Sequence, residues 1–517
     1  MKKLRKSIRR TAKNIKIGRK KAPERPPTPP PPRPSATADK PWRVLITGGA
    51  GHVAQQLVAQ LEDQVRDQLT KEVGAWMTWE FEHNQKQHIP AKSVKRRRDN
   101  LIVLIDQEVE KLLRTRLQIV LVDVFDIGHS SYENHVALVK GSFTNETKMK
   151  TALERVDTVF HLAAVGMTGY YAVSFLIHTT KYKTNFQRDR AACLAINSIG
   201  TMKFLNWCKI QGVQRFVYVS SIGTIFDGKP LINSEENHGV YPDKHYNHYC
   251  ESKRHAELIV YKATSDQMKT IILRFNGIYG PGEKRVTERV VNFMKSGWWI
   301  ATCKPKGVEA VTQLSSVGNC VQALIKADVA LRYADAKQGR IYNIMDRNPV
   351  GTFSFWNPLN EGFGFSPPFL TIHPYILRVL AYICEIIAFI FRLDPLFSVL
   401  ELDLLCVTTT FSLDRAIREL YYRPEDSPMN EIVEMYVGRV KKKDLYGNPT
   451  AEFTEEWKKF LQRRTYFLKF MAFLAFVGVI VTSYYGFHAA VPFIEHYRGY
   501  FRMIYSRIIL PIIAIFI

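Results

Sequence analysis

Short apolar runs alternate with longer amphipathic stretches through the first 275 residues of the chain. The stretches between the runs are long enough for helices, as from Asn197 to Cys208. Strands that alternate with helices predict an α/β fold with a parallel, doubly wound sheet. The runs that fit buried strands are Trp42–Ile46, Gln118–Asp123, Val156–Ala164, Arg215–Ser221 and Thr270–Phe275.

A charged stretch without strand character, residues 62–116, separates the first predicted helix from the second predicted strand. We interpret it as an insertion, and a solvated helical hairpin is the default expectation. It contains the basic run Lys95–Arg98. Leu101–Ile105, followed by Asp106, is a weaker rival to Gln118–Asp123 for the second strand.

A glycine-rich turn, TGGAG at residues 47–51, directly follows the first predicted strand. Gly48 permits a tight turn, and Gly51 lets backbone N–H groups approach a pyrophosphate at a helix N-terminus. Ala54 occupies the third position of the fingerprint, where alanine is tolerated. Because strand, turn and helix follow one another, the turn predicts a dinucleotide site.

The second strand of such a fold is expected to end in an acid that binds the adenine ribose. Asp123 holds that position and would repel a 2′-phosphate, so NAD is favoured over NADP. Because the insertion lengthens the usual spacing between the glycine turn and this acid, Asp123 could instead be an ordinary surface acid at a strand end. Ala163 lies where a strand ends in small residues, as a backbone that passes close to a cofactor requires.

Two tyrosines have a lysine four residues later, in the pairs Tyr249–Lys253 and Tyr333–Lys337. On a helix these side chains share a face, and an ammonium beside a phenol favours a phenolate base. The spacing alone does not separate the two pairs. The Tyr249 helix comes directly after the strand that ends in Ser221, so both side chains can face the ligand crevice. We therefore expect Tyr249 to be catalytic and Tyr333 to lie on the surface.

Positive charge is concentrated at the N-terminus of this chain of 517 residues and net charge +24. Residues 1–21 contain eleven Lys or Arg and no acid, and no apolar run follows to make a signal peptide. An amphipathic helix on an anionic membrane and a disordered tail both fit. Without a nucleic-acid-binding motif, a nucleic-acid partner is not expected. The Pro-rich segment Pro23–Pro34 completes a tail over residues 1–40.

The seven cysteines are scattered and form no CxxC pair. This pattern fits a reducing compartment and argues against a disulfide framework or a metal site. The sequence leaves open a homodimer.

The C-terminal part is rich in apolar segments. Phe470–Ile494 contains no Asp, Glu, Lys or Arg over 25 residues, which is long enough to span a bilayer, whereas Ile508–Ile517 is too short. Tyr375–Phe391 carries Arg378 and Glu385 on one helical face. We interpret it as an interfacial or re-entrant helix that shapes an apolar substrate entrance.

Basic residues flank the predicted span unevenly, and this bias favours a cytosolic catalytic domain, with the endoplasmic reticulum as the expected membrane. Together the patterns divide the chain into a tail (1–40), an NAD-binding domain (41–275), a substrate-binding region (276–465) and a membrane anchor (466–517). The upstream basic residues are Lys458, Lys459, Arg463, Arg464 and Lys469, against Arg498, Arg502 and Arg507 downstream.

Taken together, the motifs resemble the extended short-chain dehydrogenase/reductase superfamily, and within it the 3β-hydroxysteroid dehydrogenase/isomerase-like family and its 42E branch. The resemblance covers residues 42–430 apart from the insertion. It rests on TGGAG (47–51), FHLAAVGMTG (160–169), VYVSSIGTIFDG (217–228), YCESK (249–253), LRFNGIYGPGEKR (273–285) and FSLDRAIRELYYRP (411–424).

The resemblance implies that Tyr249 accepts a proton while Lys253 lowers its pKa and holds the nicotinamide ribose. Ser221 would orient the substrate oxygen, with Ser220 as the fallback, and Asn197 matches a catalytic NxxGT pattern. The implied reaction is NAD-dependent oxidation of a secondary alcohol, in the first place the 3β-hydroxyl of a steroid or sterol.

Two departures from the family pattern keep other functions open. Ser142 stands where the family usually has an adenine-side aspartate, and Ser315–Asn319 replaces a stretch that usually bears His or Asp. The alternatives are a nucleotide-binding membrane scaffold or sensor without catalysis, and a dehydrogenase of another hydrophobic alcohol. Isomerisation or decarboxylation beside the oxidation is not decided by the sequence.

Overall fold

The computed structural model describes residues 41–83, 91–127, 135–166, 190–236, 241–295, 299–333, 339–365, 367–368, 370–391 and 398–437. The predicted tail (1–40) and the predicted span Phe470–Ile494 lie outside these residues. Within them, no helix combines the length and the apolar character needed to cross a membrane.

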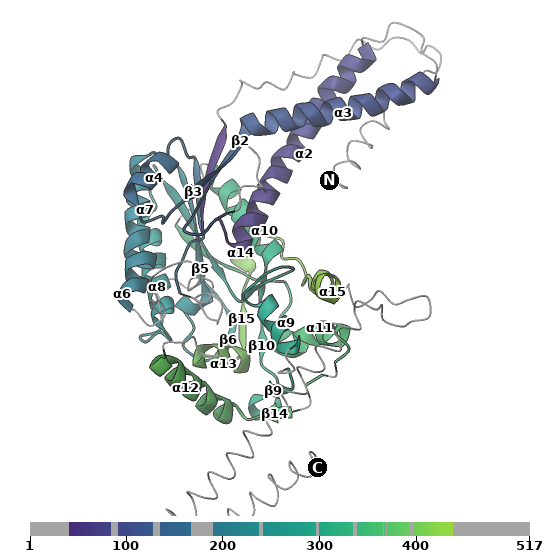
Figure 1. Ribbon diagram of the computed structural model, residues 1–517. Helices are drawn as coiled ribbons and strands as arrows, with labels where there is room; N and C mark the ends of the chain where they lie inside the picture. Colours follow the sequence, from purple (N-terminus) through teal and green to yellow (C-terminus); the bar gives the residue numbers. More distant parts are fainter. Residues whose placement is uncertain are drawn as a thin grey trace, which may run out of the picture. The chain divides into compact units, whose positions relative to one another are not determined.

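Seven parallel strands form the large sheet, in the order β12-β7-β5-β4-β1-β2-β3 (Figure 1). The chain runs outward from β1 to β3, returns to pair β4 with β1, and then runs outward in the other direction. Ligands of open α/β sheets bind at the carboxyl ends of strands beside such a reversal. The strands are β1 (Trp42–Thr47), β2 (Leu117–Asp123), β3 (Val136–Lys140), β4 (Thr158–His161), β5 (Arg215–Ser221), β7 (Lys269–Phe275) and β12 (Arg340–Ile344).

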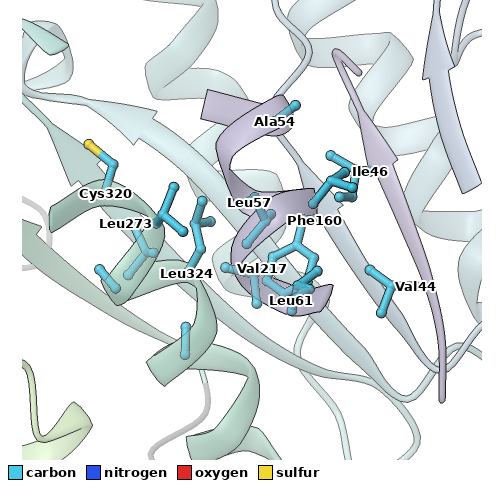
Figure 2. Close-up of a cluster of buried hydrophobic side chains, with 14 of the residues drawn as sticks. Val44, Ile46, Ala54, Leu57, Leu61, Phe160, Val217, Leu273, Cys320 and Leu324 are labelled. Atoms are coloured by element: carbon cyan, nitrogen blue, oxygen red, sulfur yellow. The ribbon is translucent and has the colours of Figure 1, made fainter. Parts of the chain in front are cut away.

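Successive residues of each strand point to opposite faces of the sheet, and each face has its own apolar core. Figure 2 shows one core, where Val44 and Ile46 of β1 and Val217 of β5 meet Leu57 of α2. Leu45, between the first two, belongs to the other core. Each such fully buried side chain contributes about 1.5–3 kcal/mol to stability. The first face is covered by α2 (His52–His83), α10 (Val317–Leu331) and α14 (Asp414–Leu420), and the second by α4 (Glu146–Ala152), α7 (Thr201–Ile210) and α8 (His248–Ala263).

The predicted insertion is helical. Helix α2 continues far beyond the glycine turn and packs against α3 (Ala91–Arg116), with Arg66 bonded to Glu110 at 2.8 Å. Leu101–Ile105 lies inside α3, so the rival placement of the second strand there is wrong. The hairpin is also less solvated than expected, because Val73, Val109 and other apolar side chains are buried in the core.

The smaller sheet takes strands from both sides of residue 275. Its order is β13-β10-β15-β6, with β6 (Leu231–Ser234), β10 (Val311–Thr312), β13 (Val350–Gly351) and β15 (Thr409–Phe411). Conversely, β12 of the large sheet comes from the predicted substrate-binding region. The role of residues 276–465 in substrate binding stays a prediction.

Short elements complete the described chain. Two further pairs of strands are β8 (Ile278–Tyr279) with β11 (Ser315–Ser316) and β9 (Ala301–Cys303) with β14 (Leu370–Ile372). The remaining helices are α6 (Arg190–Cys193), α9 (Thr287–Lys295), α11 (Asn357–Gly362), α12 (Pro374–Phe391), α13 (Val399–Cys406) and α15 (Met429–Val437), with η2 (Leu194–Gly200), η3 (Ile222–Thr224), η4 (Pro305–Gly307) and η5 (Ser354–Trp356).

Candidate active site

The glycine turn after β1 approaches the end of β4 closely. Gly48 has φ +77°, and a Cβ atom there would lie 3.1 Å from the backbone nitrogen of Ala163. Only glycine fits this backbone conformation without strain, and only a small neighbour permits the approach. Gly51 donates its N–H to the carbonyl of Gly48 at 2.9 Å, which closes the turn at the start of α2. This cradle fits a pyrophosphate.

Asp123 lies beside this turn, at the end of β2. Its carboxylate accepts hydrogen bonds from the backbone N–H of Ala50 at 2.9 Å and of Phe125 at 3.1 Å. Asp123 therefore holds the strand end to the glycine turn, where an adenine ribose would bind. Asp106, the rival acid, lies on α3.

His161, at the end of β4, links two elements of the site and was not singled out from the sequence. Its ring nitrogens lie 2.7 Å from the hydroxyl of Thr47 and 3.0 Å from that of Thr201. Burial, and to a smaller extent the charge of Lys253, lowers the pKa of His161 to about 3. A neutral imidazole thus joins Thr47, at the end of β1, to Thr201, at the start of α7.

Tyr249 is almost buried in the first turn of α8, at 9% exposure. Asn247 caps this helix, since its side chain accepts the N–H of Cys250. The loop after β4 lies against the tyrosine, because a Cβ atom added at Gly166 would be 3.4 Å from the Cβ atom of Tyr249. The hydroxyl of Ser221 lies near the phenol and favours its ionised form. The structure therefore brings Ser221 and Tyr249 together beside the ends of β4 and β5, as the topology predicted.

Burial raises the pKa of the Tyr249 phenol above its ordinary value of 10. Two groups act in the opposite direction and favour the phenolate, namely the positive charge of Arg285 and the nearby hydroxyl of Ser221. Arg285 was not singled out from the sequence, although it ends the quoted motif LRFNGIYGPGEKR.

Lys253 follows one turn later on the same face of α8. Its ammonium donates to the carbonyl of Val219 at 2.5 Å and lies 4.3 Å from the centre of the Tyr218 ring. Burial lowers the pKa of Lys253 to about 7, and the carboxylate of Glu257 opposes that shift. The lysine is thus held at β5, behind the tyrosine.

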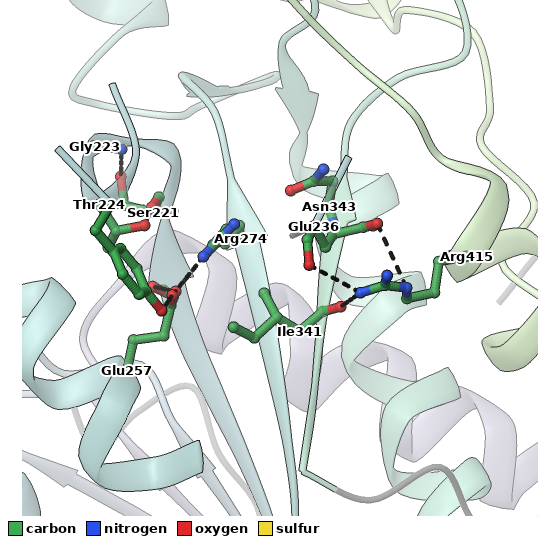
Figure 3. Close-up of polar contacts among 11 residues, drawn as sticks. Ser221, Gly223, Thr224, Glu236, Glu257, Arg274, Ile341, Asn343 and Arg415 are labelled. Carbon is green, nitrogen blue, oxygen red and sulfur yellow. Dashed lines mark hydrogen bonds and ion pairs between the residues drawn. The ribbon is translucent and has the colours of Figure 1, made fainter. Parts of the chain in front are cut away.

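Ser220 contacts a buried charge cluster that contains Glu257 and Arg274, the pair drawn in Figure 3. Its hydroxyl donates to Glu257 at 2.6 Å, and Arg274 donates to the same carboxylate at 2.6 and 3.1 Å. Burial works against the charge, but Arg274, Ser220 and Tyr241 outweigh it and hold the pKa of Glu257 below its ordinary value. Ser220 is therefore committed to this cluster, and the placement favours Ser221 in the site.

Asn197 does not face the phenol. It lies in the π-helix η2, a rare form that is common at functional sites. Its side-chain amide bonds both the N–H and the carbonyl of Val165, at 2.8 and 2.7 Å, and the hydroxyl of Ser252 at 2.9 Å. Asn197 thus fixes the loop after β4 to α8, which is a positioning role.

The other predicted positions are also accounted for. Tyr333 is 62% exposed, as expected of a surface residue. Ser142 bonds Thr144 within its own turn at 2.7 Å, and Ser316 caps α10. None of the seven cysteines takes part in a disulfide. In the part of the chain that the structure describes, no cluster of side chains could hold a metal ion.

Comparison with known proteins identifies the family. A family model described as the 3-beta hydroxysteroid dehydrogenase/isomerase family matches residues 107–373. The 3beta-hydroxysteroid dehydrogenase/Delta(5)-Delta(4) isomerase 1 of Caenorhabditis elegans is 52% identical over 401 residues, which cover 78% of this chain and 80% of the relative. The chain belongs to the 3-beta hydroxysteroid dehydrogenase/isomerase family. It is an NAD-dependent dehydrogenase, as predicted.

More distant relatives agree with this family. The human short-chain dehydrogenase/reductase family 42E member 1 is 30% identical, over 58% of this chain and 76% of its own. The decarboxylating sterol-4-alpha-carboxylate 3-dehydrogenase of Schizosaccharomyces pombe is 26% identical, over 60% and 87%. An epimerase from Methanothermobacter thermautotrophicus shares the fold, with a TM-score of 0.50 at 16% identity over 82% of this chain and 95% of that one.

Proposed function

We propose that this chain oxidises the 3β-hydroxyl of a steroid or sterol through Ser221, Tyr249 and Lys253, with NAD as the hydride acceptor. The observation that carries the proposal is the buried Tyr249 phenol, which lies beside Ser221 at the carboxyl end of β5. The substrate class is supported by two relatives, which are named as a 3beta-hydroxysteroid dehydrogenase and a sterol dehydrogenase.

In the proposed reaction Tyr249 removes the hydroxyl proton of the substrate, and Ser221 orients the substrate oxygen. When bound, NAD would supply the hydride-accepting chemistry, and the hydride would come from the carbon that bears the hydroxyl of the substrate. Arg285 and Ser221 stabilise the phenolate against the cost of burial.

The residues that would hold NAD lie along the reversal of strand order. Gly48 and Gly51 would bind the pyrophosphate and Asp123 the adenine ribose, while Ala163 leaves room for the cofactor. Lys253 would hold the nicotinamide ribose once its ammonium exchanges the Val219 carbonyl for the sugar.

The test is Tyr249→Phe, assayed by NADH formation from 3β-hydroxysteroids and from a lipid extract. Turnover should fall at least about 100-fold, within the range for general-base catalysis, while NAD affinity stays close to the parent value. Tyr333→Phe is the matched control and should behave as the parent. Substantial activity in Tyr249→Phe would remove the mechanism, and a loss in Tyr333→Phe would point to the other tyrosine.

Membrane association is the second part of the proposal, with Phe470–Ile494 as the anchor and the catalytic domain on the cytosolic face of the endoplasmic reticulum. It is supported by the apolar length of that segment and by the excess of basic residues before it.

The chain carries a reporter of its orientation in Asn145-Glu146-Thr147, a glycosylation acceptor next to α4. A cytosolic domain leaves Asn145 unmodified, so glycosidase treatment should not change the mass of the protein. A glycosidase-sensitive shift that is absent from Asn145→Gln would overturn the orientation.

A further inference from the structure

Helix α12 lies next to α13 (Figure 1), and two of its charged side chains bond that neighbour. The guanidinium of Arg378 bonds the carboxylate of Asp403, and Glu385 accepts the backbone N–H of Val399 at 2.9 Å. Ala381 is fully buried and packs with Val399. These contacts fix the rotation of the helix about its axis.

The opposite face of α12 is apolar and exposed. Among residues 374–385, whose side chains the structure describes, six large ones are each between 42% and 71% exposed, and their positions fall on one side of the helix. Patches of this kind mark binding surfaces. The residues are Tyr375, Ile376, Val379, Leu380, Tyr382 and Ile383.

We propose that this face of α12 docks onto the surface of a lipid bilayer, with the helix axis in the plane of the interface. The face carries no acid, its two tyrosines are suited to the headgroup level, and Arg378 at its edge keeps 47% side-chain exposure beside anionic lipid. The sequence beyond residue 437 contains the apolar segment Phe470–Ile494, so the chain itself supplies a reason for a bilayer to be near. The inference rests on the membrane association proposed above.

The docking surface is joined to the active site through one carboxylate. Asp403, which binds Arg378 of α12, also accepts the hydroxyl of Tyr246 at 2.6 Å. Tyr246 immediately precedes the cap of α8 and lies three residues before Tyr249. A helix that lies on the bilayer would therefore hold the catalytic helix near the phase in which an apolar alcohol dissolves.

The experiment places the photo-crosslinker p-benzoylphenylalanine at Tyr382 of the full-length chain, bound to vesicles of phosphatidylcholine and phosphatidylserine. Irradiation should give lipid adducts, identified by mass spectrometry. The matched control carries the crosslinker at Tyr333, which is 62% exposed on another element. The adduct yield at Tyr382 should be several times that at Tyr333.

Each other outcome contradicts the inference. Adducts from position 382 to residues 438–517 would show that the chain covers its own helix, and a crosslinked dimer would show that a second copy does. A chain that floats with the vesicles but gives no lipid adduct at Tyr382 would overturn the docking of α12 alone. A chain that does not float would overturn the membrane association as well.

Discussion

Helices α8 and α12 both depart from the usual pattern of apolar side chains inside and polar side chains outside, each in its own way. Helix α8 buries a phenol, an ammonium and a carboxylate at Tyr249, Lys253 and Glu257, whereas α12 exposes a row of large apolar side chains. Charges are tolerated inside α8 because each one has a partner on β5 or β7. The difference shows that the available partners, more than hydropathy, decide which face of a helix turns inward in this chain.

The largest stability effect is expected from Glu257→Gln, which removes the buried carboxylate but keeps its shape. Arg274 would then remain buried without a counter-charge, and the free energy of unfolding in urea should fall by about 3–5 kcal/mol. Asp126→Asn, in the exposed pair with Lys140, is the control and should cost less than about 1 kcal/mol. Equal losses in the two variants would mean that the cluster does not hold α8.

The same cluster predicts a dependence on pH. Because the pKa of Glu257 is held below its ordinary value, its charge stabilises the folded chain above that ordinary value. The contribution should disappear as the pH falls through the lower, folded-state value. The advantage of the parent chain over Glu257→Gln should therefore begin to shrink below the ordinary value of 4.5 and decrease further in stronger acid, which a series of urea titrations from pH 7 downward would detect.

Lys253→Met should raise the free energy of unfolding at pH 7, whereas Glu257→Gln should lower it. Burial lowers the pKa of Lys253 to about 7 from 10.5, so the unfolded chain binds this proton more tightly between those values, and parent stability should rise with pH there. The variant should lose that slope and gain up to a few kcal/mol at pH 7, at about 1.4 kcal/mol per pKa unit, while losing turnover. Lys262→Met, exposed on the same helix, should keep the slope. A slope unchanged in Lys253→Met would contradict the buried ammonium.

A smaller and more local effect is expected from Asp403→Asn. Arg378 and Tyr246 would lose a charged acceptor, at a cost on the order of 1–3 kcal/mol. Hydrogen exchange should quicken in α12 and α13, with little change at the centre of α8. Asp266→Asn, on the surface, is the control. Faster exchange throughout α8 would show that the link through Asp403 reaches beyond the start of that helix.

Much of the nucleotide half was predictable from the sequence, because its signals are local. The apolar runs marked the strands, and the turn at Gly48 and the acid at Asp123 lie at strand ends where the pattern put them. The spacing of tyrosine and lysine gave two candidate pairs, and the order of the strands favoured Tyr249, which follows the strand that ends in Ser221. Local spacing and topology are sufficient when neighbouring elements determine the site.

The remainder depended on contacts between distant residues. Leu101–Ile105 has strand composition, but packing against α2 makes it helical, so tertiary contacts overrode the local pattern. Arg285 acts on Tyr249 from another element, and no spacing relates the two residues. Glu257 could have been found, since it continues the face of Tyr249 and Lys253 by one more turn of α8.

The hairpin of α2 and α3 has a consequence for the order of folding. Strands β1 and β2 are neighbours in the sheet, yet all of residues 48–116 separate them, and each doubling of such a connection adds about 0.6 kcal/mol to the entropy cost of closing it. Two helices that pair locally, through contacts such as Arg66 with Glu110, bring the strand ends together in advance. We expect Arg66→Ala to slow refolding more than it speeds unfolding, as measured by stopped-flow fluorescence, with Gln68→Ala as the exposed control. Refolding at the parent rate would show that the sheet assembles before the hairpin.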